Sequence, residues 1–98
     1  MKEVLKNLDK AFENRIRLGI MSSLCVNEYM DFNTLKEVLD VTDGNLASHL
    51  KSLEKNNYIT YKKEFLKRKT NTCYFATPLG IKAFKKHLNA IEEFIKQY

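Results

Sequence analysis

The sequence is poor in the residues that mark linkers, repeats and disulfide scaffolds. Its 98 residues include one proline, three glycines and two cysteines, and tryptophan is missing. The glycines and the proline are scattered, and neither a repeat nor a low-complexity tract is present. A chain of this length can bury one modest core, so we expect a single domain over residues 1–98.

Long apolar runs are also missing. No uncharged stretch approaches the roughly 20 residues that a membrane-spanning helix needs, so none is predicted. The opening stretch, MKEVLKNLDKAFENR, has too much charge for a secretory signal, and we expect a cytoplasmic protein. Cys25 and Cys73 lie 48 positions apart, without the spacing of a metal site. We expect both to be small apolar core residues, with a thiol redox switch as the less favoured alternative.

Groups suited to catalysis or metal binding are equally scarce. His49 and His87 fall on different predicted helices, and the sequence has neither a phosphate-binding loop nor a nucleophile motif. Residues 42–57 contain no cysteine, and Glu92 and Glu93 are poorly spaced to share a metal ion with His87. We therefore expect no enzymatic activity, no cofactor and no metal. No feature marks a pocket for a small-molecule effector.

Charge is distributed unevenly along the chain. The net charge is +5, but residues 1–50 hold six Lys/Arg against eight Asp/Glu, whereas residues 51–98 hold eleven against four. The stretch KKEFLKRK, residues 62–69, alone has five basic residues and one acidic residue. A basic segment this compact favours a polyanionic partner over an ordinary solvated loop.

The first half of the chain has the apolar spacing of helices. This spacing covers residues 2–12, 14–25 and 34–39, with a short extended piece at 28–32. Asn33 is the expected N-cap of the third helix, and Thr42 that of a fourth. Two short helices that meet at a tight turn form a helix-turn-helix.

The second half changes period. Aromatic and β-branched residues predict strands at 58–65 and 72–76, joined by a basic tip into a hairpin. Thr77 and Pro78 then begin one long helix that runs to the end. The predicted fold class is therefore mainly α with a small β-hairpin, that is, α+β.

The fourth helix, in the stretch VTDGNLASHLKSLEKNNYI, has two contrasting sides. On a helical wheel, Leu46, Leu50 and Leu53 fall together and anchor it to the core, and Asp43 is expected to point inward. The other side is small and polar, and consists of Gly44, Ser48, Ser52 and Lys55, flanked by Asn45 and Lys51, with His49 at its margin.

Such a face suits the major groove of DNA, because small residues permit close approach and asparagine can pair with adenine. Base contacts usually come from the N-terminal part of the helix. We predict them at Gly44, Asn45, Ser48 and His49, the last as a base or phosphate contact. Contacts with the DNA backbone are predicted at Thr42, Lys51, Ser52 and Lys55. An ordinary solvated helix is the alternative, which the adjoining turn and basic hairpin disfavour.

The chain resembles small winged helix-turn-helix transcriptional regulators of the MarR/ArsR-like superfamily. The resemblance covers about residues 14–84 and lies in NRIRLGIMSSL, FNTLKEVLDVTDGNLASHLKSLEKNNYI, the basic hairpin and TPLGIKAF. In that family the corresponding helix reads TDGNLSxHLxxLE, and a tyrosine-led strand follows it. The resemblance implies that residues 42–57 form a recognition helix.

By the same resemblance, the hairpin over residues 62–71 is the wing, which in such proteins lies along the minor groove or the DNA backbone. The expected wing contacts are Lys62, Lys67, Arg68, Lys69 and Thr70. A narrow minor groove attracts arginine, so Arg68 is the best candidate for it. The tip FLKRKTN lacks the glycine and proline that often shape this turn in the family.

The last helix has more apolar residues than so small a core can cover. Ile81, Phe84, Leu88, Ile91 and Ile95 repeat with spacings of 3 and 4, as in the a/d seam of a coiled coil. We expect residues 77–98 to pair with their copy in a homodimer, assisted by residues 1–13, while residues 14–76 form the helix-turn-helix and wing. The expected dimer interface is Leu5, Leu8, Phe12, Leu88, Ile91, Phe94, Ile95 and Tyr98.

These patterns predict a sequence-specific regulator of transcription, a repressor rather than an activator, that binds double-stranded DNA as a homodimer. Its two recognition helices would address half-sites about one helical turn apart. The alternative is a winged helix that binds another protein without DNA sequence specificity. Such a module needs neither a basic wing nor a small polar recognition face.

Overall fold

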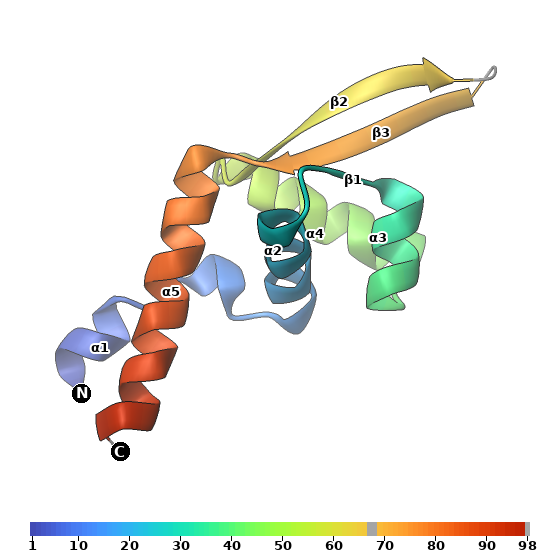
Figure 1. Ribbon diagram of the computed structural model, residues 1–98. Coiled ribbons are helices and arrows are strands. Elements are labelled where there is room, and N and C mark those ends of the chain that lie inside the picture. Colours follow the sequence, from blue (N-terminus) through green and yellow to red (C-terminus); the bar gives the residue numbers. More distant parts are fainter. Residues whose placement is uncertain (67–68, 98) are drawn as a thin grey trace.

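The computed structural model describes residues 1–66 and 69–97, without the side chains of Leu66 and Gln97. In chain order the elements are α1 (Lys2–Lys6), the 3₁₀ helix η1 (Lys10–Phe12), α2 (Arg15–Val26), β1 (Met30–Asp31), α3 (Phe32–Leu39), α4 (Asp43–Lys55), β2 (Ile59–Leu66), β3 (Lys69–Ala76) and α5 (Pro78–Gln97). Figure 1 shows α2, α3 and α4 gathered below the sheet, the β2–β3 hairpin projecting from them, and α5 to one side. The predicted α+β class is confirmed.

One apolar cluster holds the helices and the sheet together. Its fully buried side chains are Phe12, Ile20, Met21, Leu35, Leu46, Leu50 and Leu53. Ile59 of β2 and Phe84 of α5 belong to the same cluster. Burying a side chain of this kind contributes about 1.5–3 kcal/mol, so this cluster is the main source of stability.

The turn between α3 and α4 sets the direction of α4. Asp40 ends α3 with φ at 52°, a left-handed conformation that aspartate adopts more readily than most residues. The hydroxyl oxygen of Thr42 accepts a hydrogen bond from the N–H of Asn45 at 3.2 Å, which confirms the predicted N-cap. The three leucines of α4 are buried as predicted, so its polar side faces outward.

The N-terminal segment is two short helices rather than the single helix predicted over residues 2–12. Asp9 interrupts it because its backbone and side chain bond elsewhere. Its N–H donates to Nδ1 of His87 at 2.9 Å, and its carboxylate accepts from the N–H of Ala11 at 2.9 Å and from the hydroxyl of Tyr58 at 2.6 Å. The ring of Phe12 contacts both Tyr58, at a centroid distance of 5.3 Å, and His87, at 5.4 Å. His87, 3% exposed, is thus a packing residue.

The start of α3 also differs from the prediction. The N-cap is Asp31, whose carboxylate accepts from the N–H of Thr34 at 2.8 Å, and the helix begins at Phe32. Asn33 therefore lies inside the helix and is exposed. The helix is thus two residues longer at its start than predicted, and Phe32 packs partly on the core.

The two cysteines occupy different environments. Cys73 is 5% exposed, as predicted, and burial, with Glu64 and Asp31 nearby, raises the pKa of its thiol. Cys25 is exposed on α2, so its predicted core position was wrong. Met21 and Leu24 lie on the buried side of α2, and Cys25, the residue after Leu24, lies outside that side.

The sheet has three antiparallel strands in the order β1-β3-β2. Met30 pairs with Tyr74 at one edge, and the hairpin pairs without a break from Ile59↔Ala76 to Leu66↔Lys69. The predicted strand 58–65 is shifted by one residue from β2, and the predicted strand 72–76 was too short, because residues 69–71 continue the ladder. Residues 67–68 of the predicted basic tip lie outside the described residues.

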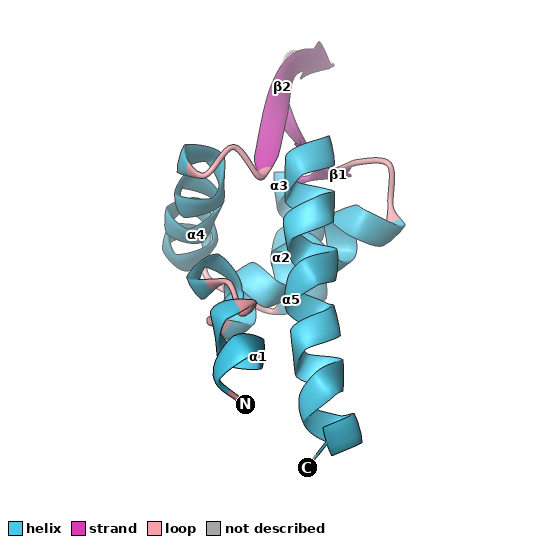
Figure 2. Ribbon diagram, turned by 90° about the vertical axis from the view of Figure 1, so that its left-hand side faces the viewer, coloured by secondary structure: helices cyan, strands magenta, loops and turns pink. Residues whose placement is uncertain are grey.

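Helix α5 is fastened to the end of α4. The hydroxyl of Thr77 accepts from the N–H of Gly80 at 2.9 Å, as predicted for an N-cap, and donates to the carbonyl of Asn57 at 2.7 Å. The backbone N–H of Thr77 donates to the carbonyl of Tyr58 at 3.0 Å. Figure 2 shows α1 beside the C-terminal half of α5, where Val4 and Ala90 are buried. None of the helices among the described residues is long and apolar enough to cross a membrane.

Candidate nucleic-acid interface

The outward side of α4 is accessible along its length. Gly44, Asn45 and Ser48 are exposed near its N-terminus, and Ser52 is half-buried one turn later. A β-carbon at Gly44 would meet no heavy atom within 4 Å, so the surface there is open. The predicted position of these small polar residues, on the outer face of the helix, is confirmed.

Basic and hydroxyl groups border this face. Lys51 and Lys55 are exposed on α4, and Thr42 is exposed at its start. The Thr42 oxygen is occupied as the cap of the helix, which leaves its hydroxyl hydrogen to donate outward. These positions suit contacts with phosphates on either side of a groove.

Asp43 departs from its predicted orientation. Its side chain is 70% exposed and pairs with Lys36 of α3, with Nζ 2.9 Å from the carboxylate. As the first residue of α4 it has little contact with the core, and an outward carboxylate still lies favourably near the positive end of the helix dipole. Lys36 partly neutralises the one acidic side chain in the first turn of α4.

His49 has a partner that the sequence reasoning missed. Nη1 of Arg17, on α2, lies 3.0 Å from Nδ1 of His49, and both side chains are half-buried. Partial burial lowers the pKa of His49, and the positive charge of Arg17 lowers it further. The sequence NRIR shows two arginines on α2. The helical wheel of α4 cannot indicate which of them lies beside His49.

The predicted contacts of the hairpin are divided between its two faces. Residues directly opposite each other in an antiparallel ladder share a face, so Lys62, paired with Cys73, and Lys69, paired with Leu66, lie on one face. Thr70, paired with Phe65, lies on the other. All three predicted contacts are exposed, and Lys62 also lies 3.9 Å from Glu64. The predicted contacts Lys67 and Arg68 lie outside the described residues.

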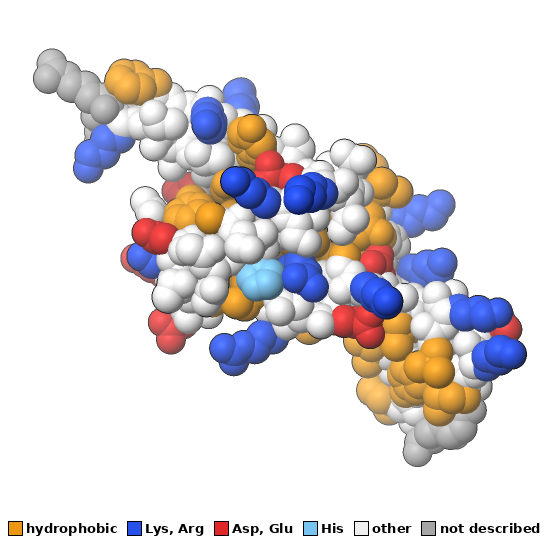
Figure 3. Space-filling model, turned by 180° about the vertical axis from the view of Figure 1, so that it is seen from behind, with side chains coloured by type: hydrophobic (Ala, Val, Ile, Leu, Met, Phe, Trp, Pro, Cys, Tyr) orange, Lys and Arg blue, Asp and Glu red, His pale blue; other side chains and the backbone are white. Residues whose placement is uncertain are grey.

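These elements contribute to one broad surface. Figure 3 shows lysine and arginine side chains spread along this side of the molecule, from the hairpin at one end toward α5 at the other, with a histidine near the middle. Acidic side chains are interspersed rather than gathered. A surface of this kind attracts a polyanion along its length.

The residues predicted for a dimer interface differ in exposure. Several lie exposed on α1 and α5, namely Leu5 at 53%, Leu88 at 43%, Ile91 at 38% and Ile95 at 77%, while Leu8 and Phe94 are half-buried. Phe12 was wrongly placed in this set, because its ring is 2% exposed and packs inside its own domain. Tyr98 lies outside the described residues.

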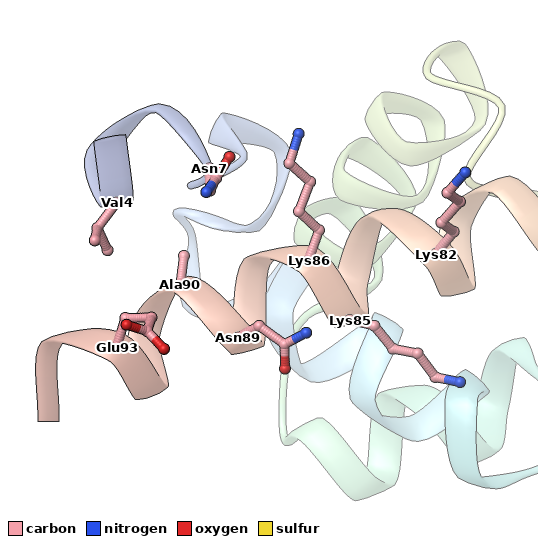
Figure 4. A pocket seen from close by; sticks show the side chains of 8 residues that line it. All are labelled: Val4, Asn7, Lys82, Lys85, Lys86, Asn89, Ala90 and Glu93. Atoms are coloured by element: carbon pink, nitrogen blue, oxygen red, sulfur yellow. The ribbon is translucent and has the colours of Figure 1, made fainter. Parts of the chain in front are cut away.

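A groove of about 490 Å³ runs between α1 and α5. Figure 4 shows Val4 and Ala90 facing each other across it, with the lysine side chains of Lys82 and Lys86 extending from α5 further along. The sequence did not indicate this groove, because it depends on how the short α1 lies against α5. No cluster of three metal-ligating side chains occurs in the part of the chain that the structure describes.

Comparison with known proteins places this geometry in context. Residues 16–95 match the family of winged helix DNA-binding domains. An uncharacterized protein of Methanocaldococcus jannaschii is 39% identical over 87 residues, which are 89% of this chain and 95% of that protein. A transcriptional regulator homologue from Pyrococcus horikoshii OT3 is 33% identical, with a TM-score of 0.86 over 97% of this chain and 92% of that one.

More distant structures share the fold alone. A MarR-family transcriptional regulator from Silicibacter pomeroyi is 17% identical, with a TM-score of 0.66 over 99% of this chain and 69% of that one. The predicted winged helix-turn-helix is confirmed, and its fold is similar to that of MarR- and ArsR-family regulators.

Proposed function

The chain belongs to the family of winged helix DNA-binding domains, and from this premise we propose that it is a sequence-specific transcriptional regulator that binds double-stranded DNA as a homodimer. One observation is central to the proposal. The side of α4 opposite its buried leucines is open, small and polar, which is the surface that a helix needs to approach base edges closely.

In this proposal α4 enters the major groove. Asn45 pairs with the N6 and N7 edge of an adenine, Ser48 contacts a neighbouring base, and Gly44 allows the backbone to come close. Thr42, Lys51, Ser52 and Lys55 bind phosphates and fix the register of the helix. Lys36 supports this arrangement by pairing with Asp43, whose carboxylate would otherwise repel the nearest phosphate.

The hairpin acts as the wing. Lys62, Lys67, Arg68, Lys69 and Thr70 lie along the minor groove or the adjacent backbone, with Arg68 the candidate for insertion into a narrow groove. Support comes from the length of the paired hairpin, which extends eight residues on each strand and projects from the helices.

Dimerisation uses the exposed apolar residues of α5 with those of α1. The twofold axis would present two copies of α4 to half-sites about one helical turn, roughly 34 Å, apart on a pseudo-palindromic operator. The dimer would regulate transcription by occupying a promoter, because polymerase cannot bind DNA that the dimer covers. The exposure of Leu88, Ile91 and Ile95 supports this assignment, since single chains rarely leave such residues together in water.

Binding to genomic DNA tests the function as a whole. Genomic fragments are selected on the protein and the enriched sites are measured by fluorescence anisotropy at several salt concentrations. We expect one pseudo-palindromic site and a steep fall in affinity with salt. A protein that enriches no fragment and binds no DNA at low salt is instead a module for protein–protein interaction, the alternative that the basic hairpin and the polar face of α4 disfavour.

A further inference from the structure

Arg17 is held in place by groups outside α4. Its Nε–H donates to the carbonyl of Ala11 at 2.7 Å, and Nη2 donates to the carbonyl of Lys10 at 3.5 Å. Both carbonyls belong to η1, so the guanidinium closes the C-terminal end of that short helix. The third contact, from Nη1 to Nδ1 of His49, joins this anchored group to α4.

The contact determines which nitrogen of His49 has the proton. A guanidinium has only N–H donors, so the Nδ1 atom facing it must accept through its lone pair. A neutral imidazole then has its proton on Nε2. Partial burial and the charge of Arg17 both lower the pKa of this histidine, which favours the neutral ring. Arg17 thus presents the Nε2–H of His49 as a fixed, uncharged donor.

Donors remain on both members of the pair. Arg17 has five N–H groups, of which three are used in the contacts above, so within the described part of the chain one N–H remains on each terminal nitrogen. His49 follows Ser48 directly and precedes Ser52 by one turn, so it borders the outward face of α4. The half-buried side chains concentrate a positive charge and a neutral donor at this border.

We propose that Arg17 and His49 together form a binding site for one phosphate of the DNA backbone, beside the base-reading face of α4. This inference rests on the proposed function and assigns His49 to a phosphate rather than to a base. A guanidinium with two free N–H groups matches phosphate geometry, and a neighbouring N–H donor completes it. Because a phosphate is the same at every step of DNA, the site supplies affinity and register without sequence preference.

The first test needs no DNA. Long-range ¹⁵N–¹H correlation of the histidine rings in the wild-type protein should show His49 protonated at Nε2 and not at Nδ1. In Arg17→Met this preference should weaken, whereas Arg15→Met, which removes an equal charge from an exposed position on the same helix, should leave it unchanged. A wild-type ring protonated at Nδ1 overturns the proposal.

The second test measures DNA binding by the same variants, on the selected operator and on an unrelated duplex. Arg17→Met should weaken both by about tenfold and flatten the salt slope by about one, with a smaller effect from Arg15→Met. His49→Asn, which keeps an acceptor near Nδ1, should lose affinity for both duplexes with an unchanged slope. His49→Gln, which keeps a donor near Nε2, should retain most of it.

Several results separate the proposal from its alternatives. Thermal melting identifies variants that bind poorly only because they unfold, and the two histidine variants cover the case in which Arg17→Met does so. The double variant Arg17→Met/His49→Asn should lose less than the product of the single losses, because both belong to one site. If Arg17→Met matches Arg15→Met, or if His49→Asn changes preference at one base pair, the phosphate site is wrong while the function stands. A wild-type protein that binds no DNA overturns both.

Discussion

Gly44 and Gly80 both lie on helices, but they differ in the space that a β-carbon would have. A β-carbon at Gly80 would collide with the backbone carbonyl of Tyr58, whereas one at Gly44 would meet open space. We expect Gly80→Ala to lower the free energy of unfolding by about 3 kcal/mol, because backbone atoms must move to admit the methyl group. Gly44→Ala should raise stability by up to about 1 kcal/mol through lower chain entropy. Urea denaturation measures both, and equal effects would contradict the close approach at Gly80.

Tyr58 links the end of α4 to Asp9. Its hydroxyl donates to the Asp9 carboxylate at 2.6 Å, and this hydrogen bond, with burial and the carboxylate charge, raises the pKa of Tyr58 to about 12. A hydrogen bond to a charged acceptor contributes about 2 kcal/mol, and Tyr58→Phe should lose about that much at neutral pH.

The pH dependence of this bond follows from the direction of the shift. The pKa is raised above the ordinary value of 10, so the contribution to stability is complete below pH 10 and is lost as the pH rises through about 12. Burial also raises the pKa of Tyr74, so absorbance titration of tyrosinate should show two late tyrosines among the five. The step near pH 12 should be missing in Tyr58→Phe, and a step near pH 12 that persists in the variant would belong to another tyrosine.

Asn45 offers the most direct test of base recognition. A bidentate amide pair with adenine discriminates against other bases by about 1–3 kcal/mol, and the amide is uncharged. Asn45→Ala should therefore relax preference at one or two positions of the operator and leave the salt slope intact. Anisotropy with operator variants measures this, and Asn89→Ala on α5 is the control. A uniform loss on all duplexes would reassign Asn45 to the backbone.

At the scale of elements, the long amphipathic helices were predictable because one repeated pattern determines each of them. The leucines of α4 lie where hydrophobic periodicity predicted them, and Thr77 caps α5 as the sequence Thr-Pro predicted. The interruption at Asp9 was not predictable, since its partners His87 and Tyr58 lie far along the chain. The cap at Asp31 and the pairing of Arg17 with His49 likewise depend on tertiary packing.

The wing provides a prediction that concerns a whole element. Replacing Arg68 and Lys69 together by glutamine should weaken binding to every duplex and flatten the salt slope by about one for each phosphate that the wing no longer neutralises. The control is Lys96→Gln on α5, which removes a charge far from the hairpin. Nζ of Lys96 lies 3.2 Å from the carboxylate of Glu92, and its loss should change DNA affinity little. A weakening confined to the operator would mean that the wing reads sequence.

At the scale of the whole molecule, the exposed apolar side of α5 determines the proposed assembly. Leu88, Ile91 and Ile95 are exposed, while α1 covers Ala90 on another side of the helix. Four exposed apolar residues, counting Leu5, give a twofold pairing an apolar surface along about two turns of α5. A dimer would also bring the two copies of α4 into a fixed relation.

The dimer prediction follows from this surface. Leu88→Glu/Ile95→Glu should leave a folded monomer, because both side chains are exposed in the single chain, and sedimentation should show half the wild-type mass. Affinity for a pseudo-palindromic site should fall about a hundredfold, because the second half-site no longer binds at high effective concentration. Val38→Glu, at an apolar position that is 60% exposed on α3, should remain dimeric. If the wild-type protein sediments as a monomer at micromolar concentration, the exposed side of α5 has another partner and the half-site geometry is wrong.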